Sequence, residues 1–255
     1  MLLAHRTAIV HGGAGAIGSA VARAYAREGA EVHLTGRTEA ALDEVARRIH
    51  RDGGRAHVAP LDVLDQTAVE RHATAVAHAA GGIDICFNAT SNDDVQGTPL
   101  LDMQLADFMR PVTKSVTAHF VIATAAARHM APRGTGVILA MAGGREAIPR
   151  LGGSHVAWAA LAGACRQLAS ELGPHGIRVA WLLSPGSPGS DEVEALHARV
   201  AHGEQEQPEA DTDGRLLHRR PSYEDVANIA VFAASDWART MTATEINFTA
   251  GAVID

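Results

Sequence analysis

The chain has 255 residues, of which 47% are hydrophobic and 20% are charged, a composition typical of a globular protein with one large core. Its net charge of −7 argues against nucleic acid or an anionic membrane as the main partner. No apolar stretch reaches the roughly 18 residues that a membrane span needs, and the first residues lack a signal-peptide pattern. We therefore expect a cytoplasmic protein that engages neither nucleic acid nor membrane.

Short apolar runs alternate with longer amphipathic segments along the chain. This alternation predicts a doubly wound, Rossmann-like parallel sheet of about seven strands with helices on both faces, in a single domain over 1–255. A polar, acidic segment at 187–218 is predicted to be a flap that shapes a ligand pocket. Strands are predicted at 7–12, 31–36, 55–63, 83–89, 136–142, 177–183 and 244–249, and helices at 16–30, 39–53, 66–82, 105–130, 154–173 and 223–235.

The cysteines and histidines carry weaker signals. Cys86 and Cys165 lie far apart, each in an apolar segment, which predicts reduced thiols in the core. His197 and His202 have acidic neighbours, but their spacing fits no helical face well. The sequence therefore predicts no metal site.

A glycine-rich turn, "HGGAGAIG", joins the first predicted strand to the first helix. Gly13, Gly15 and Gly18 match the dinucleotide fingerprint, in which glycines let a pyrophosphate approach the helix N-terminus. The second strand ends at Gly36 and Arg37, without the carboxylate that binds the ribose of NAD, and a guanidinium there can bind a 2′-phosphate. The pattern favours NADP over NAD. A turn that only packs helix on strand, and a solvated Arg37, are the alternative interpretations.

These motifs and others make the chain resemble the short-chain dehydrogenase/reductase family nearly end to end. The family's Thr-Gly-x-x-x-Gly-x-Gly appears at 11–18, with His11 in place of threonine and Ala16 in place of the middle glycine. The segments "LDV", "FNAT" and "SPG" resemble its adenine-side and nicotinamide-side motifs. Together with Arg37, the residues that the resemblance assigns to cofactor binding are Gly12, Gly15, Ile17, Gly18, Asp62, Val63, Asn88, Ala89, Pro185 and Gly186.

The resemblance also implies that the proton-transfer residues of this family are missing. The family uses a tyrosine, a lysine four residues later, a serine and an asparagine to move a proton to or from the substrate oxygen. A serine hydroxyl is a far weaker acid than a phenol, and an indole carries no charge. Standard hydride-transfer catalysis is therefore predicted to be absent or strongly impaired. The corresponding positions hold Ser154 for tyrosine, Trp158 for lysine, Met141 for serine (or Ala142 or Gly143) and Ser115 for asparagine (or Lys114).

Trp158 is also predicted to fill part of the nicotinamide-ribose pocket, which would weaken or block NADP binding. Three functions stay open for such a chain. It is an atypical carbonyl/alcohol oxidoreductase acting on a small molecule, a non-redox catalyst of the cyclase, dehydratase or isomerase type, or a non-catalytic binding or partner subunit. The candidate replacement acids are His119, Arg145, Glu146 and His155.

The family usually assembles through the two long helices, which here correspond to 105–130 and 154–173, and through the C-terminal segment. The resemblance therefore implies a homodimer or homotetramer. The many small residues in "HVAWAALAGACRQLA" suit close helix packing, although an ordinary buried helix has the same composition.

Overall fold

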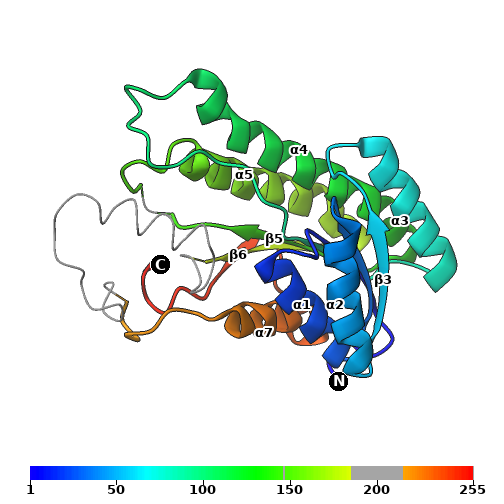
Figure 1. Cartoon of the computed structure of the whole chain (residues 1–255). Coiled ribbons are helices and arrows are strands. Elements are labelled where there is room, and N and C mark those ends of the chain that lie inside the picture. Colours follow the sequence, from blue (N-terminus) through cyan, green and yellow to red (C-terminus); the bar gives the residue numbers. More distant parts are fainter. Residues whose placement is uncertain (146, 185–214, 255) are drawn as a thin grey trace.

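A computed structural model describes residues 1–145, 147–184 and 215–254, and its centre is one parallel sheet of seven strands (Figure 1). The strand order is β3-β2-β1-β4-β5-β6-β7, which confirms the predicted doubly wound architecture. The strands are β1 (Thr7–His11), β2 (Glu31–Gly36), β3 (Arg55–Pro60), β4 (Ile85–Asn88), β5 (Gly136–Ala142), β6 (Ile177–Leu183) and β7 (Thr244–Asn247). The helices are α1 (Ala16–Arg27), α2 (Glu39–Arg51), α3 (Gln66–Ala80), α4 (Leu105–Met130), α5 (Ser154–Leu172) and α7 (Tyr223–Ala234).

Helices cover both faces of the sheet, with α1, α2 and α7 on one side and α3, α4 and α5 on the other (Figure 1). Successive strand residues point to opposite faces, so Val10 joins the core under α1 and Ile9 joins the core under α4. Both cores need apolar residues, and this is why the central strands are apolar at nearly every position.

Several boundaries follow from local chemistry. Helix α3 ends where Gly81 adopts a left-handed conformation with φ of 77°, two residues before the predicted end of the segment. Helix α7 begins with a capping box between Ser222 and Asp225.

Cys86 and Cys165 are buried free thiols, as predicted. Among the described residues, no helix combines the length and apolar character needed to cross a membrane.

The order of the strands fixes the switch point, which is where open parallel sheets of this kind bind ligands. Strand β1 lies between β2 and β4, so the chain leaves β1 and β4 toward opposite sides of the sheet at their carboxyl ends. The backbone N–H of Ala89 donates to the carbonyl of His11 at 2.9 Å, which joins the segment after β4 to the glycine-rich turn. The predicted nucleotide residues of both segments therefore meet at one edge.

Some predicted features lie outside the described residues. These are Glu146, Pro185, Gly186, most of the flap at 187–218, and the histidines His197 and His202.

Candidate functional site

The turn after β1 is built at distances that only glycine tolerates. The backbone N–H groups of Gly12 and Gly13 both donate to the carbonyl of Thr35 on β2, each at 3.0 Å. Gly12 has a φ of +76°, and a Cβ there would lie 2.5 Å from the carbonyl oxygen of Ala89. A Cβ on Gly18 would lie 2.1 Å from the carbonyl oxygen of Gly12. The glycines therefore bring β1, β4 and α1 into direct backbone contact.

The first turn of α1 presents its backbone N–H groups at this edge. The residue preceding the helix, Gly15, offers no side-chain cap, and Ala14, Gly15 and Ala16 are exposed. Amide groups that no side chain satisfies, at the positive end of a helix dipole, favour an anion. These exposed amide groups at the start of α1 fit a pyrophosphate. Ala16, which replaces a family glycine, is exposed and leaves the turn intact.

His11 replaces the threonine that normally opens this motif. Its Nδ1 lies 2.8 Å from the Thr35 Oγ1 on β2, and the residue is buried. Burial, and secondarily the nearby His72, lower the pKa of His11 to about 3, so the ring stays neutral at physiological pH. His11 therefore holds the turn as a neutral hydrogen-bonding group.

The adenine-side candidates lie at the same edge of the sheet. Arg37 and Asp62 are exposed, and the Asp62 carboxylate accepts a hydrogen bond from the Leu64 N–H at 3.0 Å, whereas Val63 is buried. Arg37 also lies near Asp93. Partial burial works to raise the pKa of Asp93, but hydrogen bonding and charge from Lys114, with a smaller contribution from Arg37, hold that pKa below its usual range.

Asn88 anchors a buried polar chain that sequence reasoning missed. Its Oδ1 accepts from the Thr90 N–H and hydroxyl at 3.1 and 2.7 Å, and its Nδ2 lies 3.4 Å from His119 Nδ1. The other ring nitrogen of His119 lies 3.3 Å from the Cys165 sulfur. Burial lowers the pKa of His119 to about 4. His119 is therefore a neutral link between β4, α4 and α5, enclosed away from solvent, which argues against its use as a replacement acid.

Ser154, at the position of the family's tyrosine, is not accessible to solvent. Its side chain is fully buried, and its hydroxyl donates to the Asp94 carboxylate and accepts from Gln96 Nε2 at 3.4 Å. The preceding Gly153 lets α5 begin against α4, because a Cβ there would lie 1.8 Å from the Phe108 carbonyl oxygen. The loop between β4 and α4 therefore covers the serine. Neither Asp94 nor Gln96 was singled out by the sequence.

Trp158, at the position of the family's lysine, lies directly on the end of β5. A Cβ on Gly143 would fall 2.3 Å from two carbons of the indole ring, so the ring occupies the space that a side chain at 143 would need. Met141 packs with the core on the opposite face of the sheet, and Ala142 packs with the core of α4 and α5. Of the three candidate serine positions, Gly143 is the one against Trp158, and a serine there would collide with the indole.

The remaining candidates have other partners. His155 Nε2 lies 2.7 Å from the carbonyl oxygen of Arg145, and the Arg145 guanidinium pairs with Glu245. Lys114 pairs with Asp93 at the start of the loop that covers Ser154. Ser115 is half-buried on α4. Apart from Glu146, which is outside the described residues, the structure therefore gives each candidate acid an interaction with another part of the chain.

Comparison with known proteins places the chain. The family model described as "Enoyl-(Acyl carrier protein) reductase" matches residues 12–252. Gluconate 5-dehydrogenase of Gluconobacter oxydans is 34% identical over 196 residues, covering 75% of this chain and 74% of that protein. A 3alpha-hydroxysteroid dehydrogenase of Mediterraneibacter gnavus is 31% identical over 251 residues, covering 95% and 94%.

Solved structures agree with the sequence relatives. A short-chain type dehydrogenase/reductase from Mycobacterium marinum superposes with a TM-score of 0.84 at 28% identity, covering 99% of this chain and 97% of that one. NAD+-bound xylitol dehydrogenase superposes with a TM-score of 0.89, covering 98% and 100%, and at 24% identity it supports the fold alone. This chain belongs to the short-chain dehydrogenase/reductase family of oxidoreductases.

Proposed function

We propose that this protein binds NADP(H) through the nucleotide end of the family site and does not carry out the family's standard hydride transfer. The observation that carries the proposal is the Trp158 indole lying against Gly143. Tryptophan at position 158 thus replaces the family's lysine. Its indole ring also occupies the space that a serine side chain at position 143 would need. The turn around Gly12 and Gly18 keeps the close backbone contacts that suit a pyrophosphate.

Positions 154 and 158 themselves offer no replacement for the family's proton transfer. Near neutral pH, a serine hydroxyl is a poor general acid, and that of Ser154 is buried against Asp94. An indole at 158 cannot lower the pKa of a neighbouring acid by charge, and it offers one donor where an ammonium offers three. A nicotinamide cofactor supplies a hydride when bound, but the described residues at 154 and 158 supply neither the proton nor the charge that the family uses beside it.

Arg37 supports the preference for NADP(H). It stands after β2, where an acidic residue would bind the ribose hydroxyls of NAD, and its guanidinium is exposed. A 2′-phosphate would form charge-assisted hydrogen bonds with it. Asp93 is close enough to feel the Arg37 charge, so a bound phosphate would compete with that carboxylate.

The test has two readouts on the same wild-type preparation. NADPH fluorescence is titrated with protein to measure affinity, and NADPH consumption is then followed with a panel of aliphatic, cyclic and steroidal ketones. We expect saturable binding, tighter for NADPH than for NADH, and no consumption above the rate without protein. The proposal fails if millimolar NADPH does not bind, or if any ketone is reduced at a rate ordinary for an enzyme, about 1 per second or faster.

The position of Asp94 beside Ser154 favours a second candidate function, a non-redox catalyst that acts at the former tyrosine position. Its carboxylate reaches the hydroxyl at the former tyrosine position, and a carboxylate is a suitable general base for isomerase or dehydratase chemistry. NMR in D₂O would follow exchange of the α-hydrogens of the same ketones. Exchange that Asp94→Asn abolishes supports this candidate. No exchange, or exchange unaffected by Asp94→Asn, excludes it for those ketones.

We also propose that the protein forms a homodimer or homotetramer through α4 and α5. These helices pack together, yet Phe120 on α4 is 55% exposed and Val156 on α5 is 42% exposed, and Gly163 has open space beside it. Light scattering after size exclusion would measure the assembly. We expect Phe120→Glu to give monomer and Trp237→Glu, at an exposed tryptophan elsewhere, to leave the assembly unchanged. A monomeric wild type contradicts the proposal.

A further inference from the structure

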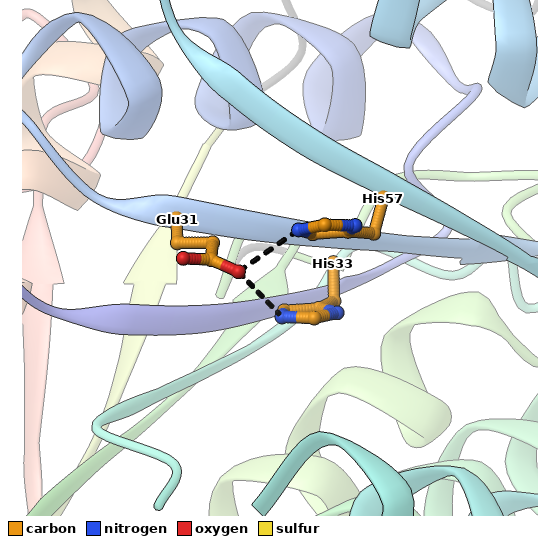
Figure 2. A group of neighbouring side chains, drawn as sticks. All are labelled: Glu31, His33 and His57. Atoms are coloured by element: carbon orange, nitrogen blue, oxygen red, sulfur yellow. Dashed lines mark hydrogen bonds and ion pairs between the residues drawn. The ribbon is translucent and has the colours of Figure 1, made fainter. Parts of the chain in front are cut away.

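We propose that Glu31, His33 and His57 form a binding site for a divalent transition-metal ion of the Zn²⁺ class, on the face of β2 and β3 that turns toward α3. Figure 2 shows the three side chains converging, with the Glu31 carboxylate beside both imidazole rings. The sequence predicted no metal site, so this inference departs from that expectation.

Strand geometry brings the ligands together. Alternate residues of a strand point to the same face, so Glu31 and His33 project together from β2. In the parallel register of β2 and β3, His33 is paired with His57. The two rings stack with their centroids 4.7 Å apart and their planes at 19° to each other. The same face of two neighbouring strands thus presents one carboxylate and two imidazoles.

The donor atoms lie at spacings near those of a bound ion. Glu31 Oε1 is 2.8 Å from His57 Nε2 and 3.9 Å from His33 Nε2, and the three donor atoms lie within 4.8 Å of one another. Tetrahedral zinc with bonds of about 2.0–2.1 Å places neighbouring ligand atoms about 3.3 Å apart. Because an imidazole ligates through a lone pair in the plane of its ring, the two stacked rings must rotate out of their near-parallel planes to direct both Nε2 atoms at one ion.

An unpartnered buried nitrogen points to a ligand at this place. His33 is 8% exposed, and its Nε2 is enclosed without a hydrogen-bond partner. A buried polar atom left unsatisfied destabilises a protein by about 1–3 kcal/mol, and such atoms are rare in native structures. A metal ion would give that nitrogen a partner, because an imidazole nitrogen ligates a metal through its lone pair.

The surrounding charges select the class of ion. Arg55 Nε lies 3.4 Å from Glu31 Oε2, which orients the carboxylate so that Oε1 faces the two histidines. The cluster combines one carboxylate and one guanidinium with two imidazole rings, so it lacks the several carboxylates of a hard-ion site. Hard ions such as Mg²⁺ and Ca²⁺ depend on several oxygen ligands, whereas Zn²⁺, Co²⁺ and Ni²⁺ bind imidazole well.

The cluster is separate from the nucleotide site. Glu31 and His33 lie in the first half of β2, away from its carboxyl end, where Gly36 and Arg37 stand. The ring of His72, on α3, lies 6.4 Å from that of His33 between centroids, and its Nδ1 is also buried without a hydrogen-bond partner. His72 is therefore the neighbour best placed to complete the coordination. An ion here would tie the edge strand β3 to β2.

The test uses the full chain after removal of metals with EDTA. Zn²⁺ binding is measured by calorimetry, and Co²⁺ is added as a spectroscopic probe whose visible absorption distinguishes four-coordinate from hydrated ion. His57→Ala and Glu31→Gln are the test variants, because both side chains reach solvent and the fold should tolerate their loss. His78→Ala, an exposed histidine on α3, is the matched control.

We expect one Zn²⁺ per chain, an affinity at least tenfold weaker in both test variants, and wild-type affinity in His78→Ala. The Co²⁺ spectrum of the wild type should show four-coordinate ion and that of His57→Ala should not. The inference is overturned if wild-type protein binds no Zn²⁺ at roughly 100 µM, a concentration far above the dissociation constant of a structural zinc site. Unchanged affinity in His57→Ala would also overturn it, since the ion would then be held by other histidines.

Discussion

The glycine-rich turn after β1 and the start of α5 stand at the same edge of the sheet, but they depart from the family pattern to very different degrees. At the turn, Gly12 and Gly18 keep the close backbone contacts, and His11 replaces a threonine while still bonding to Thr35. At α5, Ser154 is buried and Trp158 covers Gly143.

From this contrast we infer that nucleotide binding and proton transfer are separable in this fold. A glycine-rich turn binds phosphate through backbone atoms, so its function depends on where glycine stands and tolerates changes of neighbouring side chains. Proton transfer depends on side-chain groups of the right pKa, so it is lost when those side chains change. A chain can therefore keep the nucleotide end after its proton-transfer residues have gone.

The largest effect is expected where the turn is tightest. Gly12→Ala should lower the free energy of unfolding by about 3 kcal/mol, because it adds a collision with Ala89 to the strain of a positive φ. Gly53→Ala has a similar φ of +82° and no atom within 4 Å, so it should cost about 1 kcal/mol. Urea unfolding measures both. If both variants lost the same free energy of unfolding, the collision of the new methyl group with Ala89 would contribute nothing to the loss.

A smaller effect is expected from His11. Its folded pKa of about 3 lies below the unfolded value of 6.5, so only the unfolded chain takes up a proton as the pH falls. The contribution of the neutral His11 ring to the free energy of unfolding is therefore fully present above about pH 6.5, and it is lost progressively as the pH falls toward 3. Between pH 7 and pH 5 the loss amounts to about 2 kcal/mol.

Replacing His11 with the family's threonine should remove that loss. His11→Thr should therefore show a decline in unfolding free energy between pH 7 and pH 5 that is about 2 kcal/mol smaller than in wild type. Urea unfolding at the two pH values measures this, with His78→Ala as the control that should follow wild type. If the unfolding free energy of His11→Thr declined as much as that of wild type, the His11 ring would take up its proton in the folded state over the same pH range as in the unfolded chain.

The smallest effect concerns the choice of cofactor. Arg37→Glu should reduce the ratio of NADPH to NADH affinity by about tenfold or more, because a charge-assisted hydrogen bond contributes about 1.5–3 kcal/mol. Parallel fluorescence titrations with the two cofactors give the ratio. Arg71→Glu, at an exposed arginine on α3, should leave it unchanged. The same ratio in both variants would remove Arg37 from the nucleotide site.

Periodicity and turn chemistry were sufficient to predict most of the fold. The strands at 136–142 and 177–183 were predicted to the residue, because runs of apolar and β-branched residues end at clear glycine or polar boundaries. Helix ends were less certain. The helix in the segment 16–30 was predicted to end at Gly29, whereas α1 stops at Arg27 and the chain turns through Gly29.

The contacts of the site depended on information that a linear pattern lacks. Asp94 and Gln96 reach Ser154 from a loop about 60 positions away, with no periodicity to place them. The pairing of His33 with His57 follows from strand register, although the spacing of Glu31 and His33 on one strand was a usable signal.

The central claim is that the chain binds NADPH but lacks the residues that transfer the proton. The most direct test is to measure NADPH-dependent ketone reduction by the triple variant Gly143→Ser, Ser154→Tyr, Trp158→Lys. Removing the indole makes room for the serine, and the tyrosine and lysine restore the family's proton donor. We expect the variant to consume NADPH with at least one ketone of the panel, while wild type binds NADPH and stays at background. Reduction by wild type at the rate of the variant would contradict the account, as would a folded variant that binds NADPH and stays inactive on every ketone.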